Sequence, residues 1–156
     1  MNDRSALRLL EAWRQCEYHL HHLKHALAAL APLLPVTATA LSSMDDEVVQ
    51  DWDQFILRFT KLQDAMGAQL YPALLGYLQE PYEDRPMLDK LHRLESLAFL
   101  NSIEEGNNLR VIRNTFAHDY PQDDVLKAAY LNEAVAAVGV LESLLGRVAK
   151  VVDKAR

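Results

Sequence analysis

Cysteine and long apolar runs are both scarce in this chain. Cys16 is the only cysteine among 156 residues, so the chain has no disulfide framework and a reducing, cytoplasmic setting is expected. No stretch approaches the roughly 20 apolar residues that a membrane-spanning helix needs, and the run at 26–34 is short and interrupted by proline. Charges at Asp3, Arg4 and Arg8 stand where a secretory signal has its apolar core. We therefore predict a cytoplasmic protein with no membrane segment.

Positive charge is also limited. Sixteen Lys and Arg against 22 Asp and Glu give a net charge of −6, which excludes a surface that coats nucleic acid by bulk electrostatics. Any contact with RNA must therefore be local. Half of the residues are hydrophobic and only five are glycine, as is typical of a packed helical domain. The length suits a single domain over residues 1–156, large enough to fold without disulfide or metal.

The first two predicted helices follow from apolar spacing. Apolar residues recur every three or four positions over 9–30, which predicts a helix that ends at Pro32. A second helix with the same spacing covers 48–77, and Ser42 or Ser43 is expected to cap it. Pro72 lies inside this helix and should kink it or split it into two collinear pieces.

Two shorter helices are predicted in the middle of the chain. Asp84 is the expected cap of a third helix over 87–100. Ser102 stands three residues before Glu105, which is the spacing of a capping box, and predicts the start of a fourth helix. That helix should end near 117–120, just ahead of a proline.

The last predicted helix, over 125–154, is expected to be capped by Asp123 or Asp124 and is apolar on an unusually wide face. One stripe would face the core, and a second stripe implies that another helix of the same chain or a second copy covers it. The second stripe comprises Val135, Val138, Leu145 and Val152. We find no strand periodicity, repeat or domain boundary, so the predicted fold is all-α, an up-and-down antiparallel bundle of about five helices.

The candidate catalytic residues lie at the end of the predicted fourth helix, in the segment RNTFAHDY. Arg113 lies in the last full turn and His118 follows five residues later. On a continuous helix the two lie about 140° apart, so they converge only if the helix ends between them or a second chain supplies one of them. Asn114 and His118 share a face. Arg110 precedes Arg113 by one turn, so the two guanidinium groups can point to the same side.

These side chains suit the cleavage of a phosphodiester. Arginine grips a phosphate with two parallel hydrogen bonds and stabilises the charge that grows on it. Histidine takes and gives a proton near neutral pH. RNA brings its own nucleophile, the 2′-hydroxyl, so Arg113 and His118 suffice without a metal or cofactor. Taken alone, the pair is also compatible with an ordinary helix end, where cations face the carbonyl terminus.

The larger segment resembles the HEPN motif, which has an Arg, a polar residue, a short gap, a His, one further residue and a Tyr. Arg113, Asn114, His118 and Tyr120 match these positions. The motif closes the penultimate long helix of a predicted five-helix bundle, as in HEPN proteins. The segment 53–75, DQFILRFTKLQDAMGAQLYPALL, is similar to the second helix of HEPN partners of minimal nucleotidyltransferases.

The resemblance implies a function. HEPN proteins are commonly dimers whose paired motif helices form a cleft with both Arg and both His residues, and many cleave RNA without metal. In the toxin branch, a minimal nucleotidyltransferase antitoxin attaches AMP to the motif Tyr. Here this implies catalytic Arg113 and His118, supporting Asn114 and Arg110, and modification of Tyr120. We expect the Tyr120 phenol to lie open at the cleft mouth, within reach of the modifying enzyme. The alternatives are a non-catalytic subunit that presents substrate to the nucleotidyltransferase, and a helical interaction protein with an incidental motif.

Three other features could carry a function. The histidines at 19, 21, 22 and 25 look like a metal cluster, in which His21 and His25 have the i, i+4 spacing of ligands, but no Cys or carboxylate group nearby completes a site. His21, His22 and His25 lie away from the apolar stripe by helical phase and are interpreted as a solvated face. Asp64 is expected to pair with Lys61 on the surface, and orienting Arg113 is the alternative. A modest basic patch could follow an RNA backbone or be an ordinary soluble helix face. It comprises Arg85, Lys90, His92 and Arg93.

Overall fold

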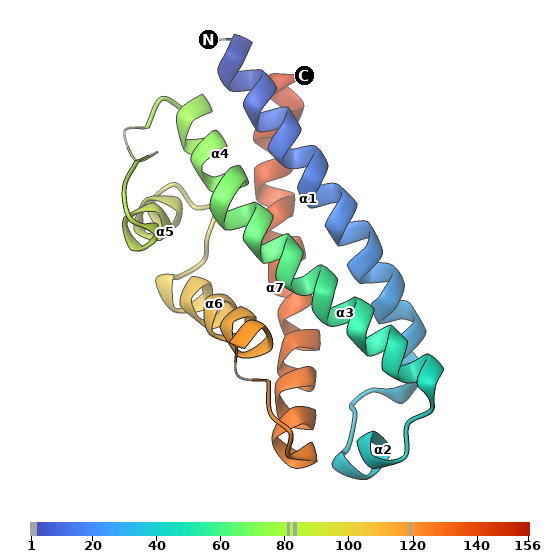
Figure 1. Ribbon diagram of the computed structural model, residues 1–156. Helices are drawn as coiled ribbons and strands as arrows, with labels where there is room; N and C mark the ends of the chain where they lie inside the picture. The colour runs from blue at the N-terminus through green and yellow to red at the C-terminus, as the bar shows by residue number, and fades with distance from the viewer. Residues whose placement is uncertain (1–2, 81, 83, 119) are drawn as a thin grey trace.

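The structure is a computed structural model that describes residues 3–80, 82, 84–118 and 120–156. These residues form α-helices with one short 3-10 helix and one π-helical turn, and the described part of the chain contains no strand (Figure 1). The prediction of an all-α protein is confirmed.

The long helices run in alternating directions. They are α1 (Asp3–Leu30), α3 (Asp46–Ala65) with its continuation α4 (Tyr71–Tyr77), α6 (Ile103–His118) and α7 (Asp124–Ala155). In Figure 1, α1 and α6 descend, α3 with α4 and α7 ascend, and both termini lie at the same end. This is the antiparallel, up-and-down order that the sequence predicts.

Two short helices complete the described chain. α2 (Ala38–Ser42) lies between the first two predicted helices, where no helix is predicted, and Thr37 caps it by accepting a hydrogen bond from the amide of Ala40 at 3.1 Å. α5 (Met87–Ser96) ends four residues earlier than predicted. Asp84 was the wrong cap for α5, because Pro86 occupies the cap position and makes no side-chain cap bond.

The cap of α3 also differs from the prediction. Asp45 accepts a hydrogen bond from the amide of Val48 at 3.0 Å. Ser42 and Ser43 instead donate to the carbonyl of Thr39, because they close α2.

The predicted starts of the last two long helices are confirmed. Ser102 Oγ accepts from the amide of Glu105 at 3.1 Å, which is the serine half of a capping box. Asp123 accepts from the amide of Leu126 at 3.0 Å at the start of α7.

Pro72 splits the second predicted helix, as expected. A π-helical turn, η2 (Met66–Leu70), separates α3 from α4, and the amide of Tyr71 donates to the carbonyl of Met66. Proline lacks an amide hydrogen and its ring clashes with the carbonyl four residues earlier, and the wider turn relieves both problems. The two pieces remain one continuous rod in Figure 1.

One hydrophobic cluster joins the long helices. Phe55 and Phe59 of α3 and Cys16 of α1 are fully buried members of this cluster. Burial raises the pKa of the Cys16 thiol to about 12. The second stripe of α7 lies mostly in this cluster, because Val138 and Leu145 are buried within the chain. Helices of the same chain therefore cover most of that stripe.

No helix in the described ranges combines the length and the apolar character that crossing a bilayer requires.

Candidate functional site

α6 is held against the bundle by its inner face. Leu109, Ile112 and Phe116 are buried, as their spacing predicts, and the Phe116 ring meets Phe59 of α3 edge to face at 5.8 Å. Helical geometry persists to His118, within the predicted end region. The packing of this one face fixes the position of every motif side chain on α6.

The Arg113 side chain is bound to α3 at two points. Its Nε donates to Asp64 Oδ1 at 2.8 Å and its Nη2 donates to Asp64 Oδ2 at 3.1 Å. Its Nη1 also donates to Asn114 Oδ1 at 3.3 Å. These bonds to Asp64 raise the pKa of the Arg113 guanidinium above its ordinary value. The expected pairing of Asp64 with Lys61 is thus replaced by the alternative, in which Asp64 orients Arg113.

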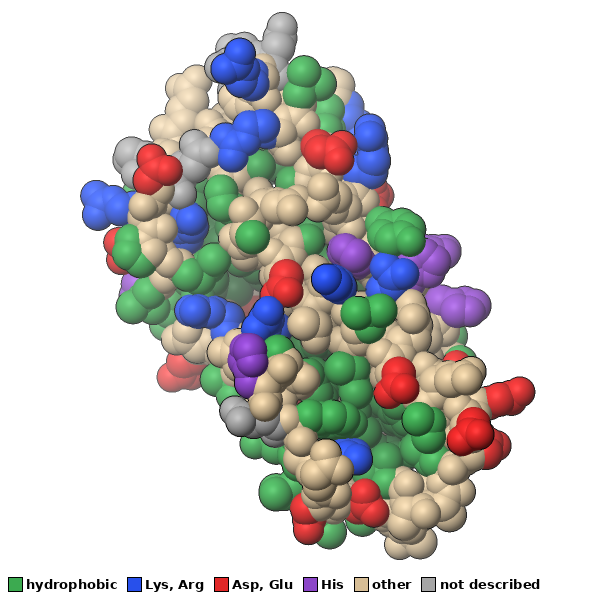
Figure 2. Space-filling view, viewed as in Figure 1, with side chains coloured by type: hydrophobic (Ala, Val, Ile, Leu, Met, Phe, Trp, Pro, Cys, Tyr) green, Lys and Arg blue, Asp and Glu red, His purple; other side chains and the backbone are tan. Residues whose placement is uncertain are grey.

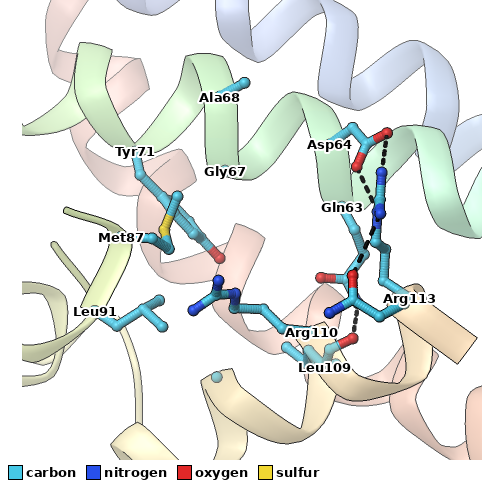
Figure 3. A pocket seen from close by; sticks show the side chains of 12 residues that line it. Gln63, Asp64, Gly67, Ala68, Tyr71, Met87, Leu91, Leu109, Arg110 and Arg113 are labelled. Atoms are coloured by element: carbon cyan, nitrogen blue, oxygen red, sulfur yellow. Dashed lines mark hydrogen bonds and ion pairs between the residues drawn. The ribbon is translucent and has the colours of Figure 1, made fainter.

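A cavity of about 560 Å³ opens beside this ion pair, between α3, η2, α5 and α6. Its apolar side is formed largely by Tyr71, Met87 and Leu91 (Figure 3). Its polar rim consists of Gln63, Asp64, Arg110, Arg113 and Asn114. The site therefore places two guanidinium groups at the edge of an apolar hollow.

Arg110 and Arg113 line the same cavity but diverge within it. Figure 3 shows Arg110 extending toward Tyr71, whereas Arg113 extends toward Asp64. Both guanidinium groups reach the cavity but, contrary to the expectation, they do not point to the same side of it. Arg110 is exposed and has no carboxylate partner among the described residues. It remains available to an anion in the cavity.

His118 lies on a different side of α6 from Arg113. The helix continues through His118, so the two side chains leave the axis about 140° apart and a single chain does not bring them together. His118 is exposed and makes no hydrogen bond or ion pair with another described residue. It shares an outward face of α6 with Asn114 and with Val111, whose exposed fraction is 58%.

Tyr120 packs just beyond the end of α6. Its ring meets Phe116 edge to face at 5.6 Å, and Lys127 Nζ lies 5.3 Å from the ring centre. The side chain is half-buried, so the expected open position at a cleft mouth is only partly realised. Burial, with repulsion from Asp53, raises the pKa of the Tyr120 hydroxyl to about 12. The phenol is therefore protonated at neutral pH.

The two other features have different outcomes. The described His, Cys, Asp and Glu residues include no group of three or more placed to hold a metal ion. In the basic patch on α5, Arg93 donates two hydrogen bonds to Glu80 at 2.8 and 2.9 Å, and Arg85 lies 3.8 Å from Asp89. Much of the positive charge of that patch is thus neutralised within the chain.

Several cavity residues were not found by sequence reasoning. Gln63 donates to the carbonyl of Leu109 at 3.0 Å and so fixes α3 against α6, and the buried Tyr71 lines the cavity. The one available signal was the break at Pro72, because a disturbed helix ahead of a proline often marks a functional position. Gly67 belongs to that turn and lines the cavity.

Comparisons with protein-family models, with curated proteins and with solved structures found no match.

Proposed function

We propose that this chain is a toxin-type HEPN ribonuclease that acts as a homodimer and cleaves RNA without metal. A minimal nucleotidyltransferase neutralises it by attaching AMP to Tyr120. The observation that carries the proposal is the different contacts of the two motif residues Arg113 and His118. Arg113 is held ready by Asp64, while His118, on the same helix, is exposed and unpartnered among the described residues.

The geometry leaves part of Arg113 free for a phosphate. Asp64 occupies the Nε and Nη2 edge of the guanidinium, so the remaining hydrogens of Nη1 and Nη2 can bind phosphate oxygens. In the proposed reaction the RNA 2′-oxygen attacks phosphorus and the bond to the 5′-oxygen breaks. The His118 of each site accepts the proton of the 2′-hydroxyl, and the resulting imidazolium gives that proton to the leaving 5′-oxygen. The products are a 2′,3′-cyclic phosphate and a 5′-hydroxyl.

A dimer would complete this site. The outward face of α6 is nearly free of charge, which suits helix-to-helix packing across a two-fold axis. Its exposed residues are Asn107, Arg110, Val111, Asn114, Ala117 and His118. In such a dimer Arg113 of one chain faces His118 of the partner subunit, which the angle between them within one chain prevents.

Modification of Tyr120 would act on the same site. The phenol oxygen attacks the α-phosphate of ATP, pyrophosphate leaves, and AMP remains on the ring. Because the hydroxyl has a raised pKa, the nucleotidyltransferase must supply a base to remove its proton. The attached phosphate places negative charge and bulk two residues from His118, where it would compete with RNA.

The cavity supports a second candidate function. An apolar hollow with Arg110 and Arg113 at its rim suits a nucleotide, with the base against Met87 and the phosphate on the guanidinium groups. A non-catalytic subunit that presents a nucleotide to a nucleotidyltransferase would use this cavity alone. It would cleave no RNA, and Arg110→Ala would weaken AMP binding measured by calorimetry.

The deciding experiment compares wild type, His118→Ala and Arg113→Ala in cells that lack a partner. We expect wild type to arrest growth and degrade RNA, and each variant to lower cleavage by roughly 10²- to 10⁴-fold. Cleavage by purified wild type should persist in EDTA and leave a cyclic phosphate, because the nucleophile belongs to the RNA.

Matched controls are His92→Ala and Arg14→Ala, which remove an exposed residue of the same type away from the motif. Both should cleave like wild type. Equal growth and intact RNA for wild type and both motif variants, with all proteins folded and dimeric, would leave the ribonuclease proposal without support.

A further inference from the structure

Two cations on α3 lack acidic partners. Among the described residues, Arg58 and Lys61 form no ion pair with a carboxylate. Arg58 instead donates from Nη1 to His19 Nδ1 at 3.1 Å, and its guanidinium lies 4.9 Å from the centre of the Tyr18 ring. The buried Nε of Arg58 has no hydrogen-bond partner. In a chain of net charge −6, unpaired cations at neighbouring positions need an explanation.

Arg58 and Lys61 lie on α3 close to Asp64, the residue that binds Arg113. Lys61 follows Arg58 by one turn, and Asp64, which holds Arg113, follows Lys61 by one turn, so Lys61 is a surface neighbour of both and connects Arg58 with the Asp64–Arg113 pair. In Figure 2 Lys, Arg and His side chains cross the middle of this face, over α6, α3 and α1, with an acidic side chain among them and further acidic side chains above and below. We call this row of basic side chains the cationic band. It consists of Arg110, Arg113, Lys61, Arg58, His19 and His22.

The cations of α3 also act on the neighbouring histidines. Partial burial is the main cause of the lowered pKa of His19, and the charges of Arg58 and Lys61 lower it further. Desolvation, followed by the charge of Arg58, lowers the pKa of His22, whose ring meets Tyr18 edge to face at 4.8 Å. The part that Arg58 and Lys61 contribute reflects positive charge close to these rings, which attracts an anion.

We infer that the cationic band is a track for the backbone of single-stranded RNA, which leads across α1 and α3 to Arg113. This inference rests on the proposed ribonuclease function and names how its substrate is bound. Three neighbouring helices with axes 8–10 Å apart span about 20 Å, enough for several phosphates. Tyr18, exposed over 55% of its surface, supplies an aromatic ring at the far end for a base.

The choice of ligand follows from the charges. The acidic remainder of the chain repels a polyanion, so binding must be confined to the band and depend strongly on salt. The α5 patch has its cations closer together in the sequence, but Arg93 and Arg85 are paired within the chain. An exposed aromatic ring beside cations favours unpaired bases over a duplex, whose bases are stacked inside.

The test uses the double variant Arg58→Gln with Lys61→Gln and a fluorescent 2′-O-methyl RNA of twelve nucleotides, which cannot be cleaved. Fluorescence polarisation at several salt concentrations gives the affinity and its salt slope. Losing two phosphate contacts should reduce the slope by about 1.4, at about 0.7 per phosphate for single strands. We expect a loss of affinity of roughly tenfold at low salt.

The control Lys150→Gln with Lys154→Gln makes the same charge change at exposed positions near the end of α7. It should bind like wild type. Arg58→Lys keeps the charge and should retain the wild-type slope, which separates charge from any effect on folding. Equal binding by the Arg58, Lys61 double variant and wild type overturns the proposal, as does wild type that binds anionic phosphatidylserine vesicles but not RNA.

The outcome is separable from that of the proposed function. If wild type binds the RNA analogue through the band but cleaves no RNA, the track stands and the ribonuclease fails. If wild type cleaves RNA and the double variant cleaves and binds equally well, the ribonuclease stands and the track fails.

Discussion

Arg113 on the inner face of α6 and His118 on its outer face differ in how many contacts the chain gives them. On the inner face, Arg113 makes two hydrogen bonds to Asp64 of α3 and a third to Asn114. On the outer face, His118 is exposed and has no hydrogen-bonding partner among the described residues. The chain thus orients one half of the motif by itself and leaves the other half for a second surface.

The inner ion pair is poorly explained by stability. The side chains of Arg113 and Asp64 are 27% and 45% exposed, and ion pairs at such positions contribute about 0–1 kcal/mol. The two-point geometry, in contrast, fixes the plane of the guanidinium, which is what recognition of a phosphate requires. We interpret Asp64 as a positioning residue.

The largest expected effect tests whether the two faces belong to one site across a dimer. We predict that mixing the inactive variants Arg113→Ala and His118→Ala, after exchange of subunits, restores about a quarter of wild-type cleavage. Random pairing makes half of the dimers mixed, and each mixed dimer holds one site with both side chains. RNA cleavage by the purified mixture measures the restoration.

Each variant alone, carried through the same exchange, is the control and should remain inactive. Native mass spectrometry should detect the mixed dimers. If they form but cleave no more than the single variants, then each site needs Arg113 and His118 from the same chain, or needs both residues from both chains.

A moderate effect is expected from Asp64→Asn. The substitution keeps the size of the side chain but puts an amide nitrogen against a guanidinium nitrogen, so the two-point grip is lost. We predict a roughly tenfold loss of cleavage, comparable to misplacing a charge-stabilising group, with a change of less than about 1 kcal/mol in the free energy of unfolding. Cleavage assays and urea denaturation measure the two quantities.

Asp89→Asn is the matched control, because Asp89 forms an exposed ion pair with Arg85 away from the motif. It should change neither quantity. Cleavage by Asp64→Asn equal to that of wild type would show that Arg113 needs no positioning.

The contrast between the two faces also shows how far the sequence predicts this molecule. Local rules predicted the capping box at Ser102 and the cap at Asp123, because each depends on residues three apart in the chain. The break at Pro72 was also predicted by a local rule, because a proline disturbs the helical turn that precedes it. The cap of α3 was missed because Ser42 and Ser43 are equally good capping residues, and the unpredicted α2 occupies them.

The site was harder to predict because its contacts join distant parts of the chain. Asp64 and Arg113 are 49 residues apart, and spacing along α3 alone favoured Lys61 as the partner. The cationic band joins α1, α3 and α6, so no single helix displays it. What the sequence did show was that Arg58 has no acidic residue three or four positions away, which is an early sign of an unpaired cation.

The smallest expected effect on cleavage is that of Tyr120→Phe. Phenylalanine keeps the edge-to-face contact with Phe116 and the ring beneath Lys127, and it removes only a hydroxyl that is protonated at neutral pH. In cells without a partner we predict cleavage within about twofold of wild type, because no step of the proposed reaction uses the phenol.

Co-expression with the cognate nucleotidyltransferase should silence wild type but not Tyr120→Phe, and intact mass should show added AMP on wild type alone. Tyr130→Phe, half-buried on α7, is the control and should be silenced like wild type. AMP on the Tyr120→Phe protein would place the modification on another residue, and lost cleavage without a partner would instead make Tyr120 part of the reaction.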